Sequence, residues 1–212
     1  MSYYTVKDAA TFEFEEKKSI FIGNVKRVSS EEEAKKFVNE IKSKHKDAKH
    51  NVYAYVIGEN MLIQRRTDDG EPQGSAGIPV IDVIKNKGIT DTAIVVTRYF
   101  GGILLGVGGL ARAYSKAASE SINKGKIVLR VKGKALSMTV NYDLLGKLQY
   151  LFEKKQWYID NTEYTDKVVL SINFANEELE MAKMVINEIT SGNCSFVEGV
   201  EKYYLKMDNR LF

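Results

Sequence analysis

The sequence predicts an α+β protein made of two domains. Its 212 residues are enough for two small domains, each with a buried core. From Ala135 onward, strand-like and helix-like segments follow the order βαββαβ over about 75 residues, which is the ferredoxin-like plan. A basic stretch bounded by Gly125 and Gly133 precedes them and marks a change in the character of the chain. We therefore expect one domain over residues 1–133 and a second over 134–212.

The first domain is predicted to alternate strands and helices. Strands are expected at residues 18–28 and 93–99, and as a hairpin at 52–57 and 61–66, because β-branched and aromatic residues gather there. One helix is expected after the capping box formed by Ser30 and Glu33. A second begins near Pro79 and stops near Gly88, and a third covers 110–123.

The second domain supplies the βαββαβ pattern. Strands are expected at 135–142, 157–164, 168–174 and 194–207. Asp143 and Asn176 are expected to cap two helices, each with an apolar face turned toward the sheet. This fold carries many functions, so it says little about activity.

Composition places the chain among cytoplasmic globular proteins. Hydrophobic residues make up 44% and charged residues 28%, and no apolar run approaches the roughly 18 residues that span a bilayer. Cys194 is the single cysteine, so no internal disulfide forms, and with only two histidines a zinc site is not expected. We predict no cofactor, no membrane association and no DNA-specific feature.

The net charge of +3 is unevenly distributed. Residues 1–133 hold 22 Lys and Arg against 16 Asp and Glu, whereas the remainder holds 9 against 12. A basic first part is typical of contact with nucleic acid, although a solvated surface explains the excess equally well.

The segment from Thr97 to Tyr114, TRYFGGILLGVGGLARAY, is the most informative one for function. Five of the sixteen glycines lie in it, between Gly101 and Gly109, and a helix is expected directly after these glycines. Such a loop directs backbone N–H groups at one point where a phosphate can bind, or it packs tightly against a neighbouring strand. The spacing fits neither GxGxxG nor a P-loop, and no lysine lies between Arg98 and Lys116. The candidate binding residues here are Arg98, Tyr99, Phe100, Gly101, Gly102, Gly106, Gly108, Gly109, Arg112 and Tyr114.

A second candidate segment, DDGEPQGSAG, covers 68–77. The further candidate binding residues are Asp68, Asp69, Glu71, Arg65, Arg66 and His50. The three carboxylates are also weak candidates for a Mg²⁺ site shared with a phosphate, since this ion prefers oxygen ligands. Taken alone, the pattern favours a turn, and the carboxylates also suit pairing with Arg65 and Arg66.

His50 and several aromatic residues allow two interpretations each. His50 stands before a predicted strand without a nucleophile pattern nearby, which favours a hydrogen-bonded structural histidine over a general base. Aromatic residues around the glycine segment suit base stacking, but at strand positions they more often fill a core.

Four segments together closely resemble the YigZ/IMPACT family, in its bacterial two-domain form. They read KKSIFIGNVKRV, DAKHNVYAY, DDGEPQGSAGIPV and VVTRYFGGILLGVGGLARAYSKA. The resemblance covers about residues 1–130, and the smaller second domain of the bacterial members matches the rest. Family members usually carry lysine after RYFGGI, where this chain has Leu104, so an anion contact from that lysine is missing here.

The resemblance implies a first domain that is an α/β two-layer sandwich, similar to domain IV of elongation factor G. It implies a second domain similar to domain V of that factor. Eukaryotic IMPACT proteins resemble this chain in the first domain only, and they regulate translation by competing for an activator of a kinase of an initiation factor. The family has no firmly assigned enzymatic activity.

Three functions follow as hypotheses. The first is a non-enzymatic cytoplasmic protein that binds RNA or the ribosome and modulates translation. The second is an enzyme that binds a nucleotide or another phosphate through the glycine segment and the carboxylates; it requires both segments to line one cleft. The third is a protein-interaction module in translational regulation.

Overall fold

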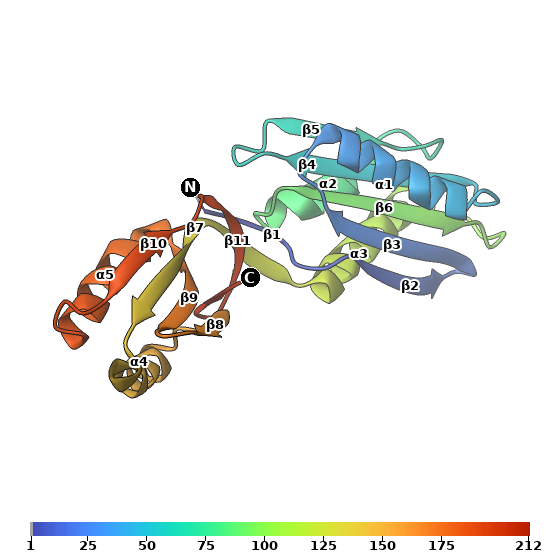
Figure 1. Ribbon diagram of the computed structural model, residues 1–212. Helices are drawn as coiled ribbons and strands as arrows, with labels where there is room; N and C mark the ends of the chain where they lie inside the picture. The colour runs from blue at the N-terminus through green and yellow to red at the C-terminus, as the bar shows by residue number, and fades with distance from the viewer. Residues whose placement is uncertain (1) are drawn as a thin grey trace. The chain divides into compact units, whose positions relative to one another are not determined.

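The computed structural model describes residues 2–212, which form two compact units, Tyr3–Val128 and Leu129–Phe212. Both units combine helices with an antiparallel sheet, which confirms the α+β class (Figure 1). The division falls inside strand β7 (Ile127–Val140), and the sequence-based limit at 133 stays a prediction. Within the described part of the chain, no helix is both long and apolar enough to cross a membrane.

The N-terminal unit is built on a five-stranded antiparallel sheet in the order β2-β3-β6-β4-β5. A short strand β1 (Tyr3–Val6) precedes it. The five strands, in sheet order, are Ala10–Glu16, Ser19–Arg27, Thr92–Tyr99, His50–Ile57 and Ile63–Thr67. The last four agree with the predicted strands.

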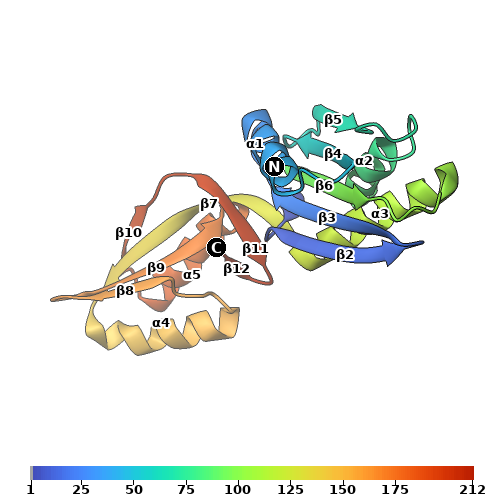
Figure 2. The same cartoon turned by 90° about the vertical axis from the view of Figure 1, so that its right-hand side faces the viewer.

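Helices cover both faces of this sheet, whereas two layers were expected. Helix α1 (Glu31–Lys44) packs on one face, and helices α2 (Gly77–Asn86) and α3 (Gly106–Gly125) pack on the other (Figures 1 and 2). In β6, Ile94 and Val96 face α2 and α3, while Ala93 and Val95 face α1. A central strand buried on both faces must be apolar at successive positions, which is why β6 shows no alternation.

Two local features differ from the sequence-based expectation. Strand β2 was not predicted, although Phe12 and Phe14 alternate there with glutamates, a period typical of a half-buried strand. Helix α3 begins at Gly106 rather than near Leu110, so Gly106, Gly108 and Gly109 belong to its first turn. Glycine lowers helix propensity, and tertiary packing overrides it here.

The C-terminal unit confirms the ferredoxin-like plan. Its order βαββαβ runs through β7, α4 (Tyr142–Lys155), β8 (Asn161–Tyr164), β9 (Val168–Ala175), α5 (Asn176–Ile189) and a final strand region. That last region is divided into β10 (Ser195–Glu198), β11 (Lys202–Met207) and β12 (Arg210–Leu211). β7 lies between β9 and the final strands, and β8 forms the other edge of the sheet. One core joins the sheet to both helices.

Close packing of α3 against β3 leads to a first prediction. A Cβ on Gly23 would lie 2.4 Å from the carbonyl oxygen of Ala117, whereas a Cβ on Gly146 in α4 meets nothing within 4 Å. Gly23→Ala is therefore expected to destabilise the protein by about 1–3 kcal/mol through overpacking. Gly146→Ala, the matched control, is expected to raise helix stability by about 0.5–1 kcal/mol. Urea unfolding of both variants measures this, and equal effects would contradict the packing argument.

Candidate functional site

The register of three strands places distant residues in one row. Arg98 on β6 lies opposite Phe21 on β3 and opposite His50 on β4. Directly opposed residues point to the same face of a sheet, here the face that carries α2 and α3. The Arg98 guanidinium carbon lies 5.5 Å from the centre of the Phe21 ring. Arg98 thus lies near the end of a largely buried strand, on the face that α3 covers.

Glu71 completes a buried cluster around Arg98. Arg98 Nη1 donates to Glu71 Oε1 over 2.8 Å, and the Tyr114 hydroxyl donates to the same oxygen over 2.8 Å. Arg98 Nη2 donates to Ser19 Oγ, which also accepts from the backbone N–H of Gly101. Arg98 is 4% exposed and Glu71 is 8% exposed. We call Ser19, His50, Glu71, Arg98 and Tyr114 the buried cluster.

Two of the predicted binding residues, Tyr114 and Arg98, are buried and stabilise the fold. Burial and the neighbouring charge of Glu71 raise the pKa of Tyr114 above its ordinary value, so its hydroxyl stays protonated and donates. The Arg98 charge is neutralised by Glu71 inside the protein rather than presented to solvent. Arg112 on α3, in contrast, is exposed to solvent.

The acidic segment folds as a turn whose carboxylates bind backbone and side-chain donors. Asp68 accepts from the N–H groups of Gly74, Ala76 and Gly77, where α2 begins. Burial by itself raises the pKa of Asp68, but these three donors outweigh it and hold the pKa below its ordinary value. Asp68 therefore organises the start of α2.

Asp69 connects the same turn to the sheet. Its carboxylate accepts from the N–H of Asn51 over 2.6 Å and from Lys42 Nζ over 2.9 Å. With Glu71 committed to Arg98, each of the three predicted carboxylates has its own protein partners. In residues 2–212 no three His, Cys, Asp or Glu side chains are grouped so as to hold a metal ion.

His50 is fixed by the acidic turn. Its Nδ1 lies 2.8 Å from the carbonyl oxygen of Asp69, and because a carbonyl only accepts, Nδ1 carries the proton. Its Nε2 lies 3.9 Å from Glu71 Oε1, beyond hydrogen-bonding distance. The ring is oriented by the protein, while Nε2 is left as an acceptor in the neutral tautomer.

The glycine segment divides into a packed part and a helix start. A Cβ on Gly101 would lie 1.9 Å from the carbonyl oxygen of Lys18, so only glycine fits against that backbone. This contact supports the tight-packing interpretation for Gly101. Gly102 has a φ of 82° and Gly106 a φ of 72°, both in the left-handed region, and Gly106 opens α3. The segment therefore turns sharply twice before the helix begins.

Both sequence-predicted segments line one cavity of about 460 Å³, which we call the histidine pocket. The strands and the acidic turn contribute one set of residues: Lys49, His50, Gly70, Glu71, Pro72 and Arg98. The glycine segment and α3 contribute the other: Phe100, Leu104, Leu105, Gly106, Val107 and Leu110. The two loops required by the nucleotide hypothesis are thus adjacent.

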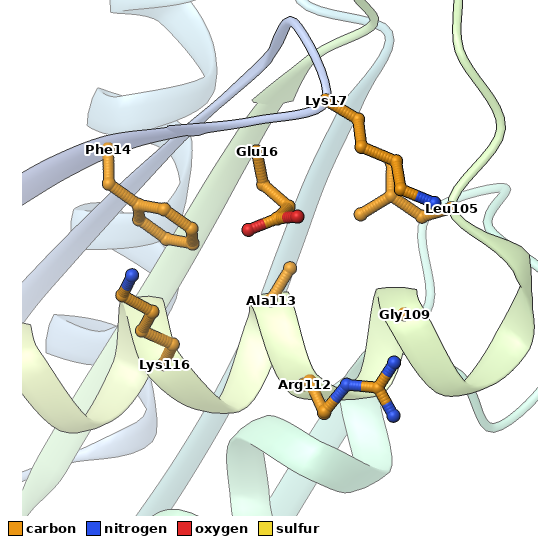
Figure 3. Close-up of a pocket in the computed structure, with 8 residues that line it drawn as sticks. All are labelled: Phe14, Glu16, Lys17, Leu105, Gly109, Arg112, Ala113 and Lys116. Atoms are coloured by element: carbon orange, nitrogen blue, oxygen red, sulfur yellow. The ribbon is translucent and has the colours of Figure 1, made fainter.

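A second cavity of about 210 Å³ lies between the β2–β3 hairpin and α3, and we call it the hairpin pocket. It is lined by Phe14, Glu16, Lys17, Leu105, Gly109, Arg112, Ala113 and Lys116. Figure 3 shows Glu16 and Lys17 coming from the hairpin, and Arg112 and Lys116 from the helix. Lys116 Nζ lies 4.3 Å from the centre of the Phe14 ring. Leu105 borders both pockets.

The remaining predicted residues lie around these pockets or apart from them. The Tyr99 hydroxyl is 2.9 Å from Nδ1 of His45, and Phe100 is 46% exposed at the rim of the histidine pocket. Arg65 lies 3.4 Å from Glu31 of α1 rather than pairing with the acidic turn. Arg66 is exposed on β5, and its charge contributes to the lowered pKa of Asp68.

Sequence reasoning missed the contributions of the N-terminal hairpin. Ser19 joins the buried cluster, while Phe14, Glu16 and Lys17 line the hairpin pocket. The alternation in TFEFEE, ending on KKS, is the signal that predicts a hairpin with a basic tip. Nothing in the sequence pairs that tip with α3, because the contact depends on sheet order.

The fold and these sites define a two-domain α+β protein whose N-terminal sheet holds a buried glutamate–arginine pair beside a glycine-rich helix start. The Impact N-terminal domain profile matches residues 17–122, and a domain of unknown function (DUF1949) matches 138–193. The chain belongs to the IMPACT family, as its resemblance predicted.

Relatives extend this similarity over both domains. The chain is 40% identical to the IMPACT family member YvyE of Bacillus subtilis, over 99% of this chain and 97% of that protein. It is 32% identical to the IMPACT family member YigZ of Escherichia coli, over 74% and 78%. A crystal structure described as a hypothetical protein superposes with a TM-score of 0.61 at 27% identity, covering 95% of this chain and 98% of that one.

The buried cluster predicts that Arg98 contributes much more to the free energy of unfolding than Arg65 does. Arg98→Met leaves the Glu71 carboxylate buried without its cation and is expected to cost about 3–5 kcal/mol of unfolding free energy. Arg65→Met, which removes an exposed pair with Glu31, is expected to cost less than about 1 kcal/mol. Chemical denaturation measures both. A double variant, Arg98→Met with Glu71→Gln, should recover part of the loss, and no recovery would contradict this explanation.

The lowered pKa of Asp68 predicts a pH-dependent contribution to stability. A carboxylate with a depressed folded-state pKa stabilises fully above its unfolded pKa of about 3.9, and this contribution disappears as pH falls through the folded value. Asp68→Asn is expected to cost about 1 kcal/mol at neutral pH. The difference from the wild type should shrink below about pH 4. Asp82→Asn, on the exposed side of α2, is the control for urea unfolding across pH.

Proposed function

We propose that this chain is a non-enzymatic cytoplasmic protein that binds RNA or the ribosome and modulates translation, with the hairpin pocket and the start of α3 as its contact surface. The observation that carries the proposal is a positively charged helix start whose first turn contains no acidic residue. Helix α3 has no side-chain cap and no acidic residue in its first turn. The N-terminal end of a helix already carries partial positive charge.

Cations add to that charge instead of reducing it. Arg112 Nη1 lies 3.7 Å from the position that a Cβ would take on Gly108, so the guanidinium extends back toward the first turn. Lys17 and Lys116 line the same pocket, where Glu16 is the one carboxylate in the lining. Among residues 2–212, none of these three cations forms an ion pair with a carboxylate of this chain.

Such a surface suits phosphates of a nucleic-acid backbone. Arg and Lys side chains, backbone N–H groups and helix N-termini are the groups that bind phosphate oxygens in these complexes. The excess of positive charge in residues 1–133 favours the same partner. The family resemblance supports a role in translation, since its first domain is similar to domain IV of elongation factor G.

The exposed apolar residues beside the glycines favour a second candidate, a protein partner. Leu104 is 81% exposed, Val107 is 62% exposed and Ile103 is 42% exposed. Contact with a protein through these side chains would respond weakly to salt and would survive nuclease. The following experiment therefore separates the two candidates.

Charge reversal at the helix start is the central test. Arg112→Glu is expected to weaken binding to ribosomes or structured RNA by about tenfold and to reduce the dependence of log K on log salt by about one unit. Lys36→Glu, an exposed position on α1, makes the same change of charge on another face and is the control. Co-sedimentation and fluorescence anisotropy at several salt concentrations measure both variants.

Three outcomes would contradict RNA or ribosome binding at this surface. They are the absence of binding, binding that does not weaken with salt, and equal losses in Arg112→Glu and Lys36→Glu. A complex that survives nuclease and high salt but is lost in Leu104→Asp would assign the surface to a protein partner.

A further inference from the structure

The histidine pocket contains two hydrogen-bond acceptors for which the described residues supply no donor. His50 is 7% exposed, and because its Nδ1 donates to the Asp69 carbonyl, the lone pair of neutral Nε2 is available. Glu71 Oε1 accepts from both Arg98 and Tyr114, whereas no hydrogen bond reaches Oε2. Both side chains line the pocket. Acceptors that largely buried side chains present to a cavity select a ligand that brings its own donors, such as hydroxyl groups.

Another part of the lining suits an anion. Gly106 and Val107, the first two residues of α3, border the pocket. The first N–H groups of a helix have no partner within it, and no side chain caps α3. An anionic group of the ligand is therefore favoured at this end of the cavity.

The remaining lining is apolar and aromatic. Phe100 lies at the rim with its ring centre 5.4 Å from the Arg98 guanidinium carbon and 6.0 Å from Lys49 Nζ. Pro72 and Leu104 add apolar surface. The volume of about 460 Å³ lies within the range of small-molecule sites, about 300–1,000 Å³. A planar body of moderate size fits this environment.

We propose that the histidine pocket binds a ribonucleoside phosphate. The ribose hydroxyls donate to His50 Nε2 and Glu71 Oε2, the phosphate meets the start of α3, and the base lies against Phe100. Pairing a carboxylate with ribose and a helix N-terminus with phosphate is a proven solution in dinucleotide-binding folds. The same chemistry is offered by a free mononucleotide and by the terminal nucleotide of an RNA. This site shares the start of α3 with the contact surface of the proposed function, whereas its hydroxyl-binding residues His50 and Glu71 lie outside the hairpin pocket, so the two proposals can be tested separately.

Ligand analogues test the proposal on the unaltered protein. AMP, GMP, CMP and UMP are titrated by calorimetry and by amide NMR shifts, each beside its 2′-deoxy form and its unphosphorylated nucleoside. At least one ribonucleotide is expected to bind at least about tenfold more tightly than both analogues, because each analogue leaves a polar group of the site unpaired. Shifts should centre on residues 50, 71 and 106–107. Equal affinity for ribose and deoxyribose, or no binding at millimolar concentration, would overturn it.

A surface variant tests the phosphate end without touching the buried cluster. Val107→Asp places a negative charge beside the helix start at an exposed position and is expected to weaken ribonucleotide binding by about tenfold or more. Leu62→Asp, at 83% exposure outside the pocket, is the control and should bind as the wild type does. Unchanged binding by Val107→Asp would contradict this placement of the phosphate.

Competition distinguishes the two sources of the ligand. A short RNA with a free terminal ribose and an RNA with its ends blocked are each added to the nucleotide complex. Displacement by the first alone identifies an RNA terminus, and displacement by neither identifies a free nucleotide. Lys116→Glu separates this proposal from the proposed function, because Lys116 lines the hairpin pocket and not the histidine pocket: it should reduce RNA or ribosome binding while mononucleotide affinity stays within about twofold.

Discussion

The ion pair between Glu71 and Arg98 holds together segments that are far apart in the sequence. Arg98 ends a central strand that is covered on both faces, so its charge requires a partner inside the protein. Glu71 reaches it only if the acidic turn folds onto the sheet, where Asp69 also binds Asn51 and His50. Through Tyr114 the same carboxylate oxygen binds α3. The Glu71–Arg98 ion pair thus positions the acidic turn, α3 and the residues that line the histidine pocket.

The N-terminal unit separates its charges into two kinds. Charges within the sheet and acidic turn are matched by internal partners and position the backbone. Lys17 on the hairpin and Arg112 and Lys116 on α3 form no ion pair within residues 2–212, and they line the hairpin pocket together with Glu16. Leu104, which is 81% exposed, gives the histidine pocket an apolar rim.

Much of the secondary structure followed from local patterns. The capping serine at position 30, the apolar β6 and the βαββαβ order each depend on residues close in sequence, and these elements form. The predicted caps Asp143 and Asn176 were wrong, because both residues lie inside the first turn of their helices. The early start of α3 and the three-layer arrangement did not follow, because glycine propensity and strand composition say little about which helix covers which face. For the site, residue types were predicted better than roles: Arg98 and Tyr114 were expected at a surface and lie inside.

The sequence alone determined the α+β class, the family, and two segments whose glycines and carboxylates mark a site. Those properties are local, since they depend on spacing and residue type within single segments. Only the tertiary structure decided that Arg98 lies opposite His50, that Glu71 neutralises it, and that Lys17 lies across a cavity from Arg112. Strand order and register set these contacts, and the cost of burying the Arg98 charge favours an arrangement in which the Glu71 carboxylate lies beside it. Strand order and charge burial depend on segments that are far apart in the sequence, so no short segment predicts them.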